Sequence, residues 1–322
     1  MATDSDDGNA PRTVKTVETS FEILDYLEER DEDDLTELAE TLDISKSAVH
    51  RHLTTLVNQG RVVNVDGYYR SVSQGVHGIE PTVDVIEALN EMKTATPEEI
   101  AAETGHSSVT VAAYLDKLEQ AEYVVERDNQ YQNGLKFLDI GERVKYNTGI
   151  FDIVAEELDK LAAESGELAL FSVMEHGQNV LLYKAHGDEA IRTSHETGLR
   201  EPMHCSGLGK SILAELPDER VRAIVERHGL EQYTEHTITD LDELLTELDE
   251  TRERGYAVDL EEAKPGMRCI AASVTSENSP LYGSVSVAAP KSRMQGERFE
   301  DEIPELVKGT ANVIELNSIY VE

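Results

Sequence analysis

The chain has few cysteines, few basic residues and no long apolar run. Its two cysteines, Cys205 and Cys269, are too few for a disulfide framework, which indicates a reducing, intracellular compartment. No apolar segment approaches the roughly 18 residues that a membrane span needs, and the acidic, polar start MATDSDDGNAPR is not a signal peptide. We therefore expect a cytoplasmic protein with no membrane partner and a disordered tail over residues 1–13.

Basic residues are outnumbered by acidic ones. The 322 residues include 29 Lys and Arg against 65 Asp and Glu, for a formal net charge of −36. Because 39% of the residues are hydrophobic, the chain is too apolar to be disordered. The acidic excess is typical of the highly solvated, halophilic surface of a protein that stays soluble in concentrated salt. Such a negative field repels nucleic acid, so a nucleic-acid site has to be a local basic island or has to work where salt screens the field.

The first 135 or so residues carry one pattern twice, displaced by 62 positions without a gap. Matching residues are mostly apolar and recur at helical spacing, which predicts two copies of one folding unit. The identical pairs are Glu37/Glu99, Ala39/Ala101, Ser45/Ser107, Val49/Val111, Leu53/Leu115, Leu56/Leu118, Val62/Val124, Val63/Val125, Asp66/Asp128 and Tyr69/Tyr131.

The first copy has the pattern of three helices and a β-hairpin. An apolar face formed by Phe21, Ile23, Leu24 and Leu27 predicts the first helix. Asp34 and Glu37 have the spacing of a capping box for the second helix. Ser45 is placed to cap a third helix that Gly60 ends. Short β runs around Asp66-Gly67 predict a hairpin, so residues 14–76 are expected to form a winged helix-turn-helix.

The third helix of the first copy is a candidate DNA reader. Between Ile44 and Arg70 the local charge is +3, in contrast to the acidic chain. Polar and basic side chains lie off the apolar stripe, on the side that a recognition helix turns to the major groove. Two arginines flank the hairpin, where they could reach the phosphates of bound DNA. An ordinary solvated helix face is the alternative interpretation. The predicted DNA-binding residues are Ser45, Lys46, Ser47, His50, Arg51, Arg61 and Arg70.

The second copy, expected over residues 77–141, keeps the fold pattern and loses the charge. Thr96-Pro97-Glu98-Glu99 is a helix start, and Asp128-Asn129 predicts the hairpin turn. The window from His106 to Gln132 has a local charge of −3. Phosphate contacts supply much of the affinity for DNA, so we expect an auxiliary role for this copy, such as dimerisation, spacing or weak DNA contact.

Mixed strands and helices over residues 142–322 predict an α/β ligand-binding domain around an antiparallel sheet. We expect strands at about 168–174, 180–185, 256–260, 268–275 and 282–288. Helices are expected to run through Ile150 to Leu161 and at about 206–215, 217–228, 240–254 and 297–317.

The sequence resembles the IclR family of transcriptional regulators. The resemblance rests on Pro202–Lys210, on Arg254–Asp259 with Gly266–Ala272, on Gly283–Pro290, and in the N-terminal part on Val17–Ser20 with Ser45–Arg51. It implies an α+β chain with a winged helix-turn-helix and a GAF-like effector-binding domain. The family usually has one winged helix, whereas this sequence predicts two in tandem, so the spacing from DNA reader to effector domain is lengthened by one unit.

The resemblance places an effector site at Gly207, Leu208, Asp259, Cys269 and Ser286. Gly207 and Leu208 would start a helix whose N–H groups favour an anion. Asp259 would accept hydrogen bonds from ligand hydroxyls or repel an anion. A second serine often found in the family is Ala288 here, so a sugar or polyol effector fits as well as a keto acid. Expected partners are a double-stranded DNA operator, this effector, and further copies of the chain in a homodimer or homotetramer.

Other classes of function are less well supported by the sequence. The sequence shows no nucleophile with a nearby base and no pair of acidic residues in a defined motif, so we expect no catalytic residues. The alternatives to a ligand-responsive regulator are a small-molecule-binding enzyme and an architectural DNA-binding protein. His204, Cys205 and Cys269 lack the close spacing of a metal site, so neither a metal nor a cofactor is expected. A redox switch would need the two cysteines to lie close together. Because buried cysteines usually act only as small apolar residues in the core, a redox switch is not the expected role.

Overall fold

The computed structural model describes residues 12–28, 33–58, 61–65, 67–71, 79–192, 196–275 and 283–319. These fall into two compact units, Met1–Asp139 and Ile140–Glu322. Most of the predicted tail lies outside the described residues, as do Gly60 and Asp66. The first helix already begins at Arg12, inside the range predicted as a tail.

The first half of unit 1 contains three helices and a small antiparallel sheet. Its helices are α1 (Arg12–Glu28), α2 (Leu35–Thr41) and α3 (Lys46–Asn58), and its strands β1 (Asp33–Asp34), β2 (Val62–Val65) and β3 (Tyr68–Ser71) pair in the order β1-β3-β2. Asp34 caps α2 by accepting the backbone N–H groups of Thr36 and Glu37, as predicted. Strand β1 was not predicted from the sequence. The buried core contains Ile23, Leu24, Leu27, Leu38, Val49, Leu53, Leu56, Val62 and Tyr69.

One residue of the predicted apolar face is not in this core. The side chain of Phe21 is 58% exposed. Helical spacing places Ile23, Leu24 and Leu27 on the buried side of α1, and Phe21 lies outside that stripe. Its assignment to the packed face was therefore wrong.

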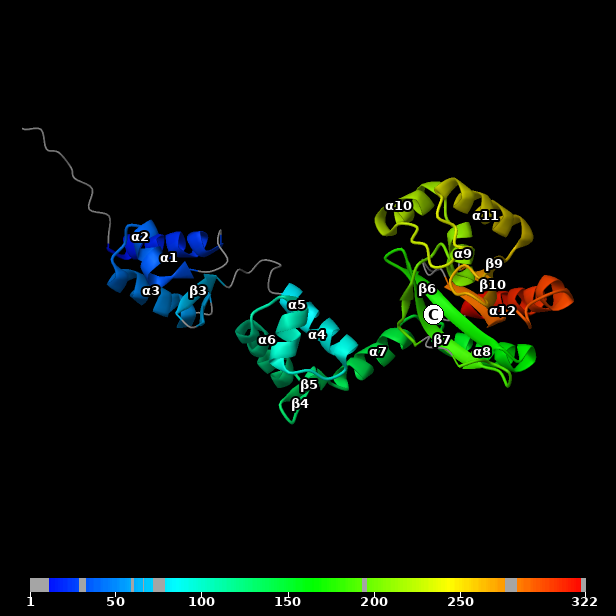
Figure 1. Cartoon of the computed structure of the whole chain (residues 1–322), viewed down its shortest axis with the longest axis horizontal. Helices are drawn as coiled ribbons and strands as arrows, with labels where there is room; N and C mark the ends of the chain where they lie inside the picture. The colour runs from blue at the N-terminus through cyan, green and yellow to red at the C-terminus, as the bar shows by residue number, and fades with distance from the viewer. Residues whose placement is uncertain are drawn as a thin grey trace, which may run out of the picture. The chain divides into compact units, whose positions relative to one another are not determined.

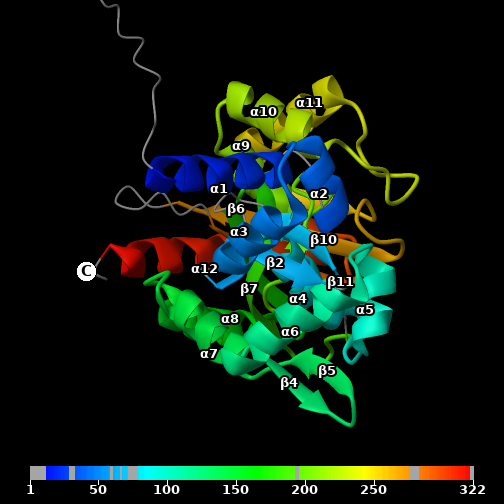
Figure 2. The same cartoon turned by 90° about the vertical axis from the view of Figure 1, so that its left-hand side faces the viewer.

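The second half of unit 1 has the same order of elements. It contains α4 (Glu80–Met92), α5 (Pro97–Thr104), α6 (Ser108–Gln120), β4 (Val124–Arg127) and β5 (Gln130–Asn133). Thr96 and Glu99 form the predicted capping box. Asp128 and Asn129 both have positive φ, 53° and 63°, which is the geometry of a tight hairpin turn. The β4–β5 hairpin extends beyond the helices that precede it (Figure 2).

From the third helix onward, the two halves of unit 1 match position by position. Each of α6, β4 and β5 begins and ends 62 residues after α3, β2 and β3, respectively. The pairing of Asp33 with Tyr69 recurs as a bridge between Ala95 and Tyr131, again displaced by 62 residues. The internal sequence match therefore corresponds to a match in backbone structure.

Helix α7 (Lys136–Tyr146) follows the second hairpin. Near its start, the ring of Phe137 packs edge-on against Tyr123, with centroids 5.2 Å apart. Near its end, Tyr146 packs against Phe151, the first residue of α8 (Phe151–Ser165).

Unit 2 is built on a six-stranded antiparallel sheet. The strands are β6 (Leu168–Glu175), β7 (Gln178–His186), β8 (Arg200–Glu201), β9 (Ala257–Leu260), β10 (Met267–Val274) and β11 (Gly283–Pro290), in the spatial order β8-β7-β6-β11-β10-β9. Five of these strands were predicted, and β8 was not. The α+β class and the N-terminal helix-turn-helix followed by a mixed domain are confirmed.

Helices cover both faces of this sheet (Figure 1). Helices α8 and α12 (Ile303–Ser318) pack on one face around the largest apolar core of the unit. Helix α9 (Gly207–Ala214) packs on the other face, and α10 (Asp218–His228) and α11 (Leu241–Arg254) pack next to it. A π-helical turn, Arg298–Glu302, precedes α12. Within the described ranges, no helix is long and apolar enough to cross a membrane.

Candidate DNA-binding and effector sites

Helix α3 presents the predicted DNA-reading residues to solvent. Its apolar face, with Val49, Leu53 and Leu56, is buried in the core of the first half-unit. Lys46 Nζ donates a hydrogen bond to Thr36 Oγ1 of α2 at 3.0 Å. The exposed predicted residues at the start and on the outer face of α3 are Ser45, Lys46, Ser47, His50 and Arg51.

The two arginines of the hairpin differ in exposure. Arg70 on β3 is exposed, whereas Arg61 just before β2 is half-buried. Arg61 Nε is buried and has no hydrogen-bond partner among the described residues. His52, which also lies on α3, is a core residue: its Nδ1 lies 2.8 Å from Ser20 Oγ, and burial, followed by the charge of Arg51, lowers its pKa.

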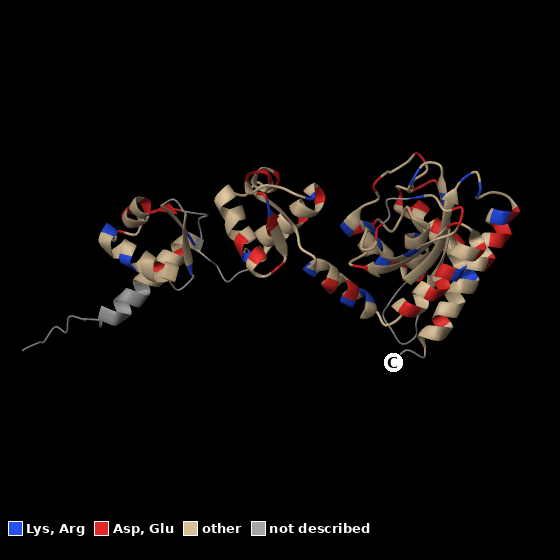
Figure 3. Cartoon of the chain, turned by 90° about the horizontal axis from the view of Figure 1, so that it is seen from below, with Lys and Arg blue, Asp and Glu red and all other residues tan. Residues whose placement is uncertain are grey.

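The corresponding surface of the second half-unit has no basic residue at the equivalent positions. With the displacement of 62, Lys46 corresponds to Ser108, Arg51 to Ala113, Arg61 to Tyr123 and Arg70 to Gln132. Ser107 caps α6, and its hydroxyl lies 2.8 Å from that of Thr110, so both hydroxyls already have a partner. Asp and Glu are spread over the described helices of both units (Figure 3).

The five predicted effector residues come together at the N-terminus of α9. Ser206 caps this helix, and all of α9 is buried. A Cβ on Gly207 would lie 3.1 Å from Cys269 Sγ, so the absence of a side chain allows α9 to approach β10 closely. Cys269 pairs with Asp259 on β9 and with Ala288 on β11. Leu208, Cys269 and Ala288 share one buried apolar cluster, and Ser286 lies two residues before Ala288.

The sequence analysis missed a buried ionic cluster beside these residues. Lys210 of α9 is fully buried and lies 2.5 Å from Glu262 Oε1. Asp259 Oδ1 accepts the backbone N–H of Glu262 at 2.7 Å. Burial is the main cause that raises the pKa of Asp259, to about 7. The one sequence signal for this cluster is a lone lysine in the otherwise apolar and small run GLGKSILA, because a lysine is buried only when it is paired.

The two cysteines are free and buried. Burial is the main cause that raises the pKa of both Cys205 and Cys269, to about 12. The thiolate is the form that reacts with oxidants and disulfides, so these thiols are poor candidates for a redox switch. In the part of the chain that the structure describes, no group of three or more His, Cys, Asp or Glu side chains is arranged to hold a metal ion.

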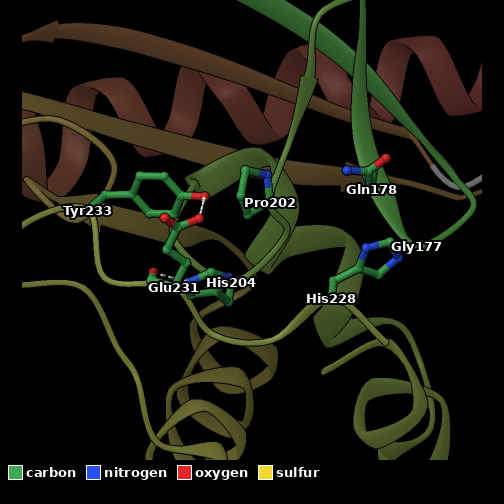
Figure 4. A pocket seen from close by; sticks show the side chains of 7 residues that line it. All are labelled: Gly177, Gln178, Pro202, His204, His228, Glu231 and Tyr233. Atoms are coloured by element: carbon green, nitrogen blue, oxygen red, sulfur yellow. Dashed lines mark hydrogen bonds between the residues drawn. The ribbon is translucent and has the colours of Figure 1, made fainter. Parts of the chain in front are cut away.

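A separate surface pocket lies next to the segment that leads into α9. It is lined by Gly177, Gln178, Pro202, His204, His228, Glu231 and Tyr233 (Figure 4). His204 Nε2 lies 3.0 Å from the carbonyl oxygen of Glu231, and the hydroxyl of Tyr233 donates to the Glu231 carboxylate at 2.9 Å. Burial lowers the pKa of His204. None of the five predicted effector residues lines this pocket.

A helix-turn-helix with a basic exposed third helix, followed by an α+β domain with a buried polar site, defines a ligand-binding transcriptional regulator. Residues 16–66 match the model of the IclR helix-turn-helix domain. Residues 143–316 match the model described as bacterial transcriptional regulator IclR C-terminal. The chain therefore belongs to the IclR family.

Individual relatives agree with this assignment. The chain is 32% identical over 239 residues to the probable HTH-type transcriptional regulator ArcR of Halobacterium salinarum, covering 73% of this chain and 90% of ArcR. It is 27% identical to the HTH-type transcriptional repressor AllR of Escherichia coli K12, covering 75% of this chain and 90% of AllR. These relatives are transcriptional regulators and not enzymes.

Solved structures share the fold. The IclR of Thermotoga maritima superposes with a TM-score of 0.63 at 24% identity, covering 76% of this chain and all of that one. An IclR homologue from Microbacterium hydrocarbonoxydans, crystallised with 4-hydroxybenzoate, superposes with a TM-score of 0.66 at 19% identity, covering 75% of this chain and 98% of that one. Residues 67–142, which lie between the two family matches, contain β3, α4, α5, α6, β4, β5 and the start of α7.

Proposed function

We propose that the first half of unit 1 is the winged helix-turn-helix that reads the operator, and that the second half is a duplicated, auxiliary winged helix. The observation that carries this proposal is the charge difference at equivalent positions. All four basic residues predicted to contact DNA become uncharged when the chain is read 62 positions later. DNA binding draws much of its affinity from phosphate contacts made by Lys and Arg.

The position of the family match supports the same assignment. The helix-turn-helix model covers residues 16–66, which include α2 and α3 and lie wholly in the first half-unit. The second half-unit lies outside both matched ranges. Its tightly capped helices and buried core nevertheless make it a folded unit, suited to spacing or to contact between copies of the chain.

The effector binds at the N-terminus of α9 in this proposal. Gly207, Leu208, Asp259, Cys269 and Ser286 lie together there, where a ligand would change the packing of α9 on β10 and β11. Ligand binding would shift the population between DNA-competent and incompetent arrangements. The working form is a homodimer or homotetramer, since paired third helices match the two half-sites of a pseudo-palindromic operator. The acidic surface fits a halophilic, cytoplasmic protein.

The experiment compares substitutions in the two halves of unit 1. The DNA is the fragment that the full chain selects from a random-sequence pool. Lys46→Ala with Arg51→Ala is expected to abolish specific binding, because it removes two exposed cations from α3. Thr110→Ala with Lys117→Ala on α6 is the matched control and is expected to cost much less. Equal losses in both variants would show that both halves read DNA, and unchanged affinity in the first would refute the assignment of α3.

A further inference from the structure

The ammonium group of Lys46 has a neutral partner, whereas many other lysines of the chain are paired with glutamates. Within the described ranges, each of the following lysines forms an ion pair with at least one glutamate: Lys145, Lys160, Lys184, Lys210, Lys291 and Lys308. Lys46 forms no ion pair among the described residues, and its Nζ atom donates a hydrogen bond to Thr36 Oγ1 at 3.0 Å instead. In a chain with 65 acidic residues, this exposed lysine therefore keeps its positive charge uncompensated.

The hydrogen bond connects the two helices of the helix-turn-helix. Thr36 is the second residue of α2, and Lys46 is the first residue of α3. The backbone N–H of Thr36 is held by the carboxylate of Asp34, at 2.6 Å from Oδ1. Leu38 of α2 and Val49 of α3 are both fully buried in the core of the first half-unit. The hydroxyl of Thr36 therefore projects from a fixed helix start, whereas the side chain that it contacts is exposed.

A neutral acceptor orders an ammonium group without neutralising it. An ammonium group has three N–H donors, so two remain for phosphate oxygens when Thr36 Oγ1 accepts one. A lysine side chain loses conformational freedom when a ligand fixes it, and this loss weakens binding. Because Thr36 already holds Lys46 in the free protein, part of the loss precedes DNA binding. A carboxylate in place of this hydroxyl would instead compete with the phosphate for the ammonium group.

The second half-unit lacks both members of this pair. With the displacement of 62, Thr36 corresponds to Glu98 and Lys46 to Ser108, and both of these residues are exposed. Glu98 and Glu99 lie in the first turn of α5, so negative charge replaces the hydroxyl at this helix start. The hydrogen-bonded pair is therefore found in the half-unit that also has the basic third helix.

We propose that Thr36 is a positioning residue for DNA binding: its hydroxyl holds the ammonium group of Lys46 at the start of α3, where this group meets a phosphate of the operator. The N-terminal end of a helix also favours a phosphate, so Lys46 and the first turn of α3 act on the same ligand. The proposal rests on the proposed function, which assigns DNA reading to α3. It adds a residue that acts through Lys46 and makes no contact with DNA itself.

The test is a double-mutant cycle on the full chain, in which Thr36→Val and Lys46→Ala are made singly and together. Valine keeps the shape of threonine but lacks the hydroxyl. Affinity for the operator fragment selected by the full chain is measured by fluorescence anisotropy at one low salt concentration. Thr36→Val is expected to weaken binding about three- to tenfold in the parent chain. In a chain that already carries Lys46→Ala, the same substitution is expected to have no effect.

Thr36→Ser is the matched control, because serine keeps the hydroxyl. This variant is expected to retain most of the parent affinity, and a loss as large as that of Thr36→Val would overturn the proposal. Equal losses from Thr36→Val with and without Lys46→Ala would mean that Thr36 contacts DNA directly or only supports the fold, which also overturns it. Unchanged affinity of Thr36→Val in the parent chain has the same consequence.

The Lys46→Ala arm separates this proposal from the proposed function. If Lys46→Ala, alone and together with Arg51→Ala, leaves operator affinity unchanged, the assignment of α3 as the DNA reader fails, and the role of Thr36 fails with it. If Lys46→Ala weakens binding and Thr36→Val does not, α3 remains the reader and only the positioning role is wrong.

Discussion

At the scale of single residues, burial decides which side chains have shifted pKa values and which charged groups need a partner. Asp259, Lys210 and Glu262 are titratable residues with almost no exposed surface. Lys210 forms an ion pair with Glu262, and Asp259 Oδ1 accepts the backbone N–H of Glu262. Glycine at position 207 lets the thiol of Cys269 approach the helix backbone. These features are not visible in the spacing of apolar residues, because they depend on which strands become neighbours.

Asp259→Asn should make stability less dependent on pH. In the folded chain, burial raises the pKa of Asp259 to about 7, whereas an unfolded chain has a value near 4. The folded state therefore holds a proton that the unfolded state has lost, so stability falls as pH rises from about 4 to about 7. Urea unfolding at several pH values is expected to show the variant more stable above pH 7, by about 4 kcal/mol. The two curves should converge near pH 4, and parallel curves would contradict the account.

Gly209→Ala should destabilise unit 2 strongly. A Cβ at this position would lie 2.2 Å from the carbonyl oxygen of Met203, and that backbone cannot move without displacing the start of α9. We expect a loss of about 2–3 kcal/mol or more in thermal unfolding. Gly309→Ala on α12 is the control: nothing lies within 4 Å of its added Cβ, so it should stabilise the helix by up to about 1 kcal/mol. A Gly209→Ala variant as stable as the parent would show that α9 packs less closely than the structure indicates.

At the scale of helices and strands, most of the fold could be predicted from the sequence. Helix caps at Asp34 and Thr96 and the turn at Asp128-Asn129 are local signals, and the structure has each of them. Strands β1 and β8 were missed because each has two residues, too few for an alternating pattern. The effector residues were grouped by family resemblance, whereas the charges around them became visible only when the sheet register was known.

Helix α6 should become a DNA-binding surface if its charge is restored. Ser108→Lys and Ala113→Arg place cations at the positions equivalent to Lys46 and Arg51, and both positions are exposed. In a chain that also carries Lys46→Ala and Arg51→Ala, we expect DNA binding to return without the original sequence preference, because phosphate contacts carry no sequence information. Binding to specific and to random DNA would be compared by fluorescence anisotropy. No recovery on either DNA would mean that α6 differs from α3 in more than charge.

At the scale of the whole molecule, a net charge of −36 has to be reconciled with DNA binding. Salt screens charges beyond about 10 Å at 0.1 M and beyond about 3 Å at 1 M, so long-range repulsion by the acidic surface fades in concentrated salt while close contacts persist. In the proposed assignment, the basic residues of the first half-unit are the groups that meet phosphates. The second half-unit lengthens the chain between that reader and the effector domain by one folded unit.

The salt dependence of operator affinity tests most directly whether the first half-unit alone reads DNA. The logarithm of the association constant falls linearly with the logarithm of salt concentration, by about 0.9 for each phosphate contact. For Lys46→Ala alone and for Arg51→Ala alone, we predict that this slope becomes shallower by about 0.9, and that Lys117→Ala leaves it unchanged. A slope that is unaffected by both single substitutions on α3, or reduced as much by Lys117→Ala, would contradict the account.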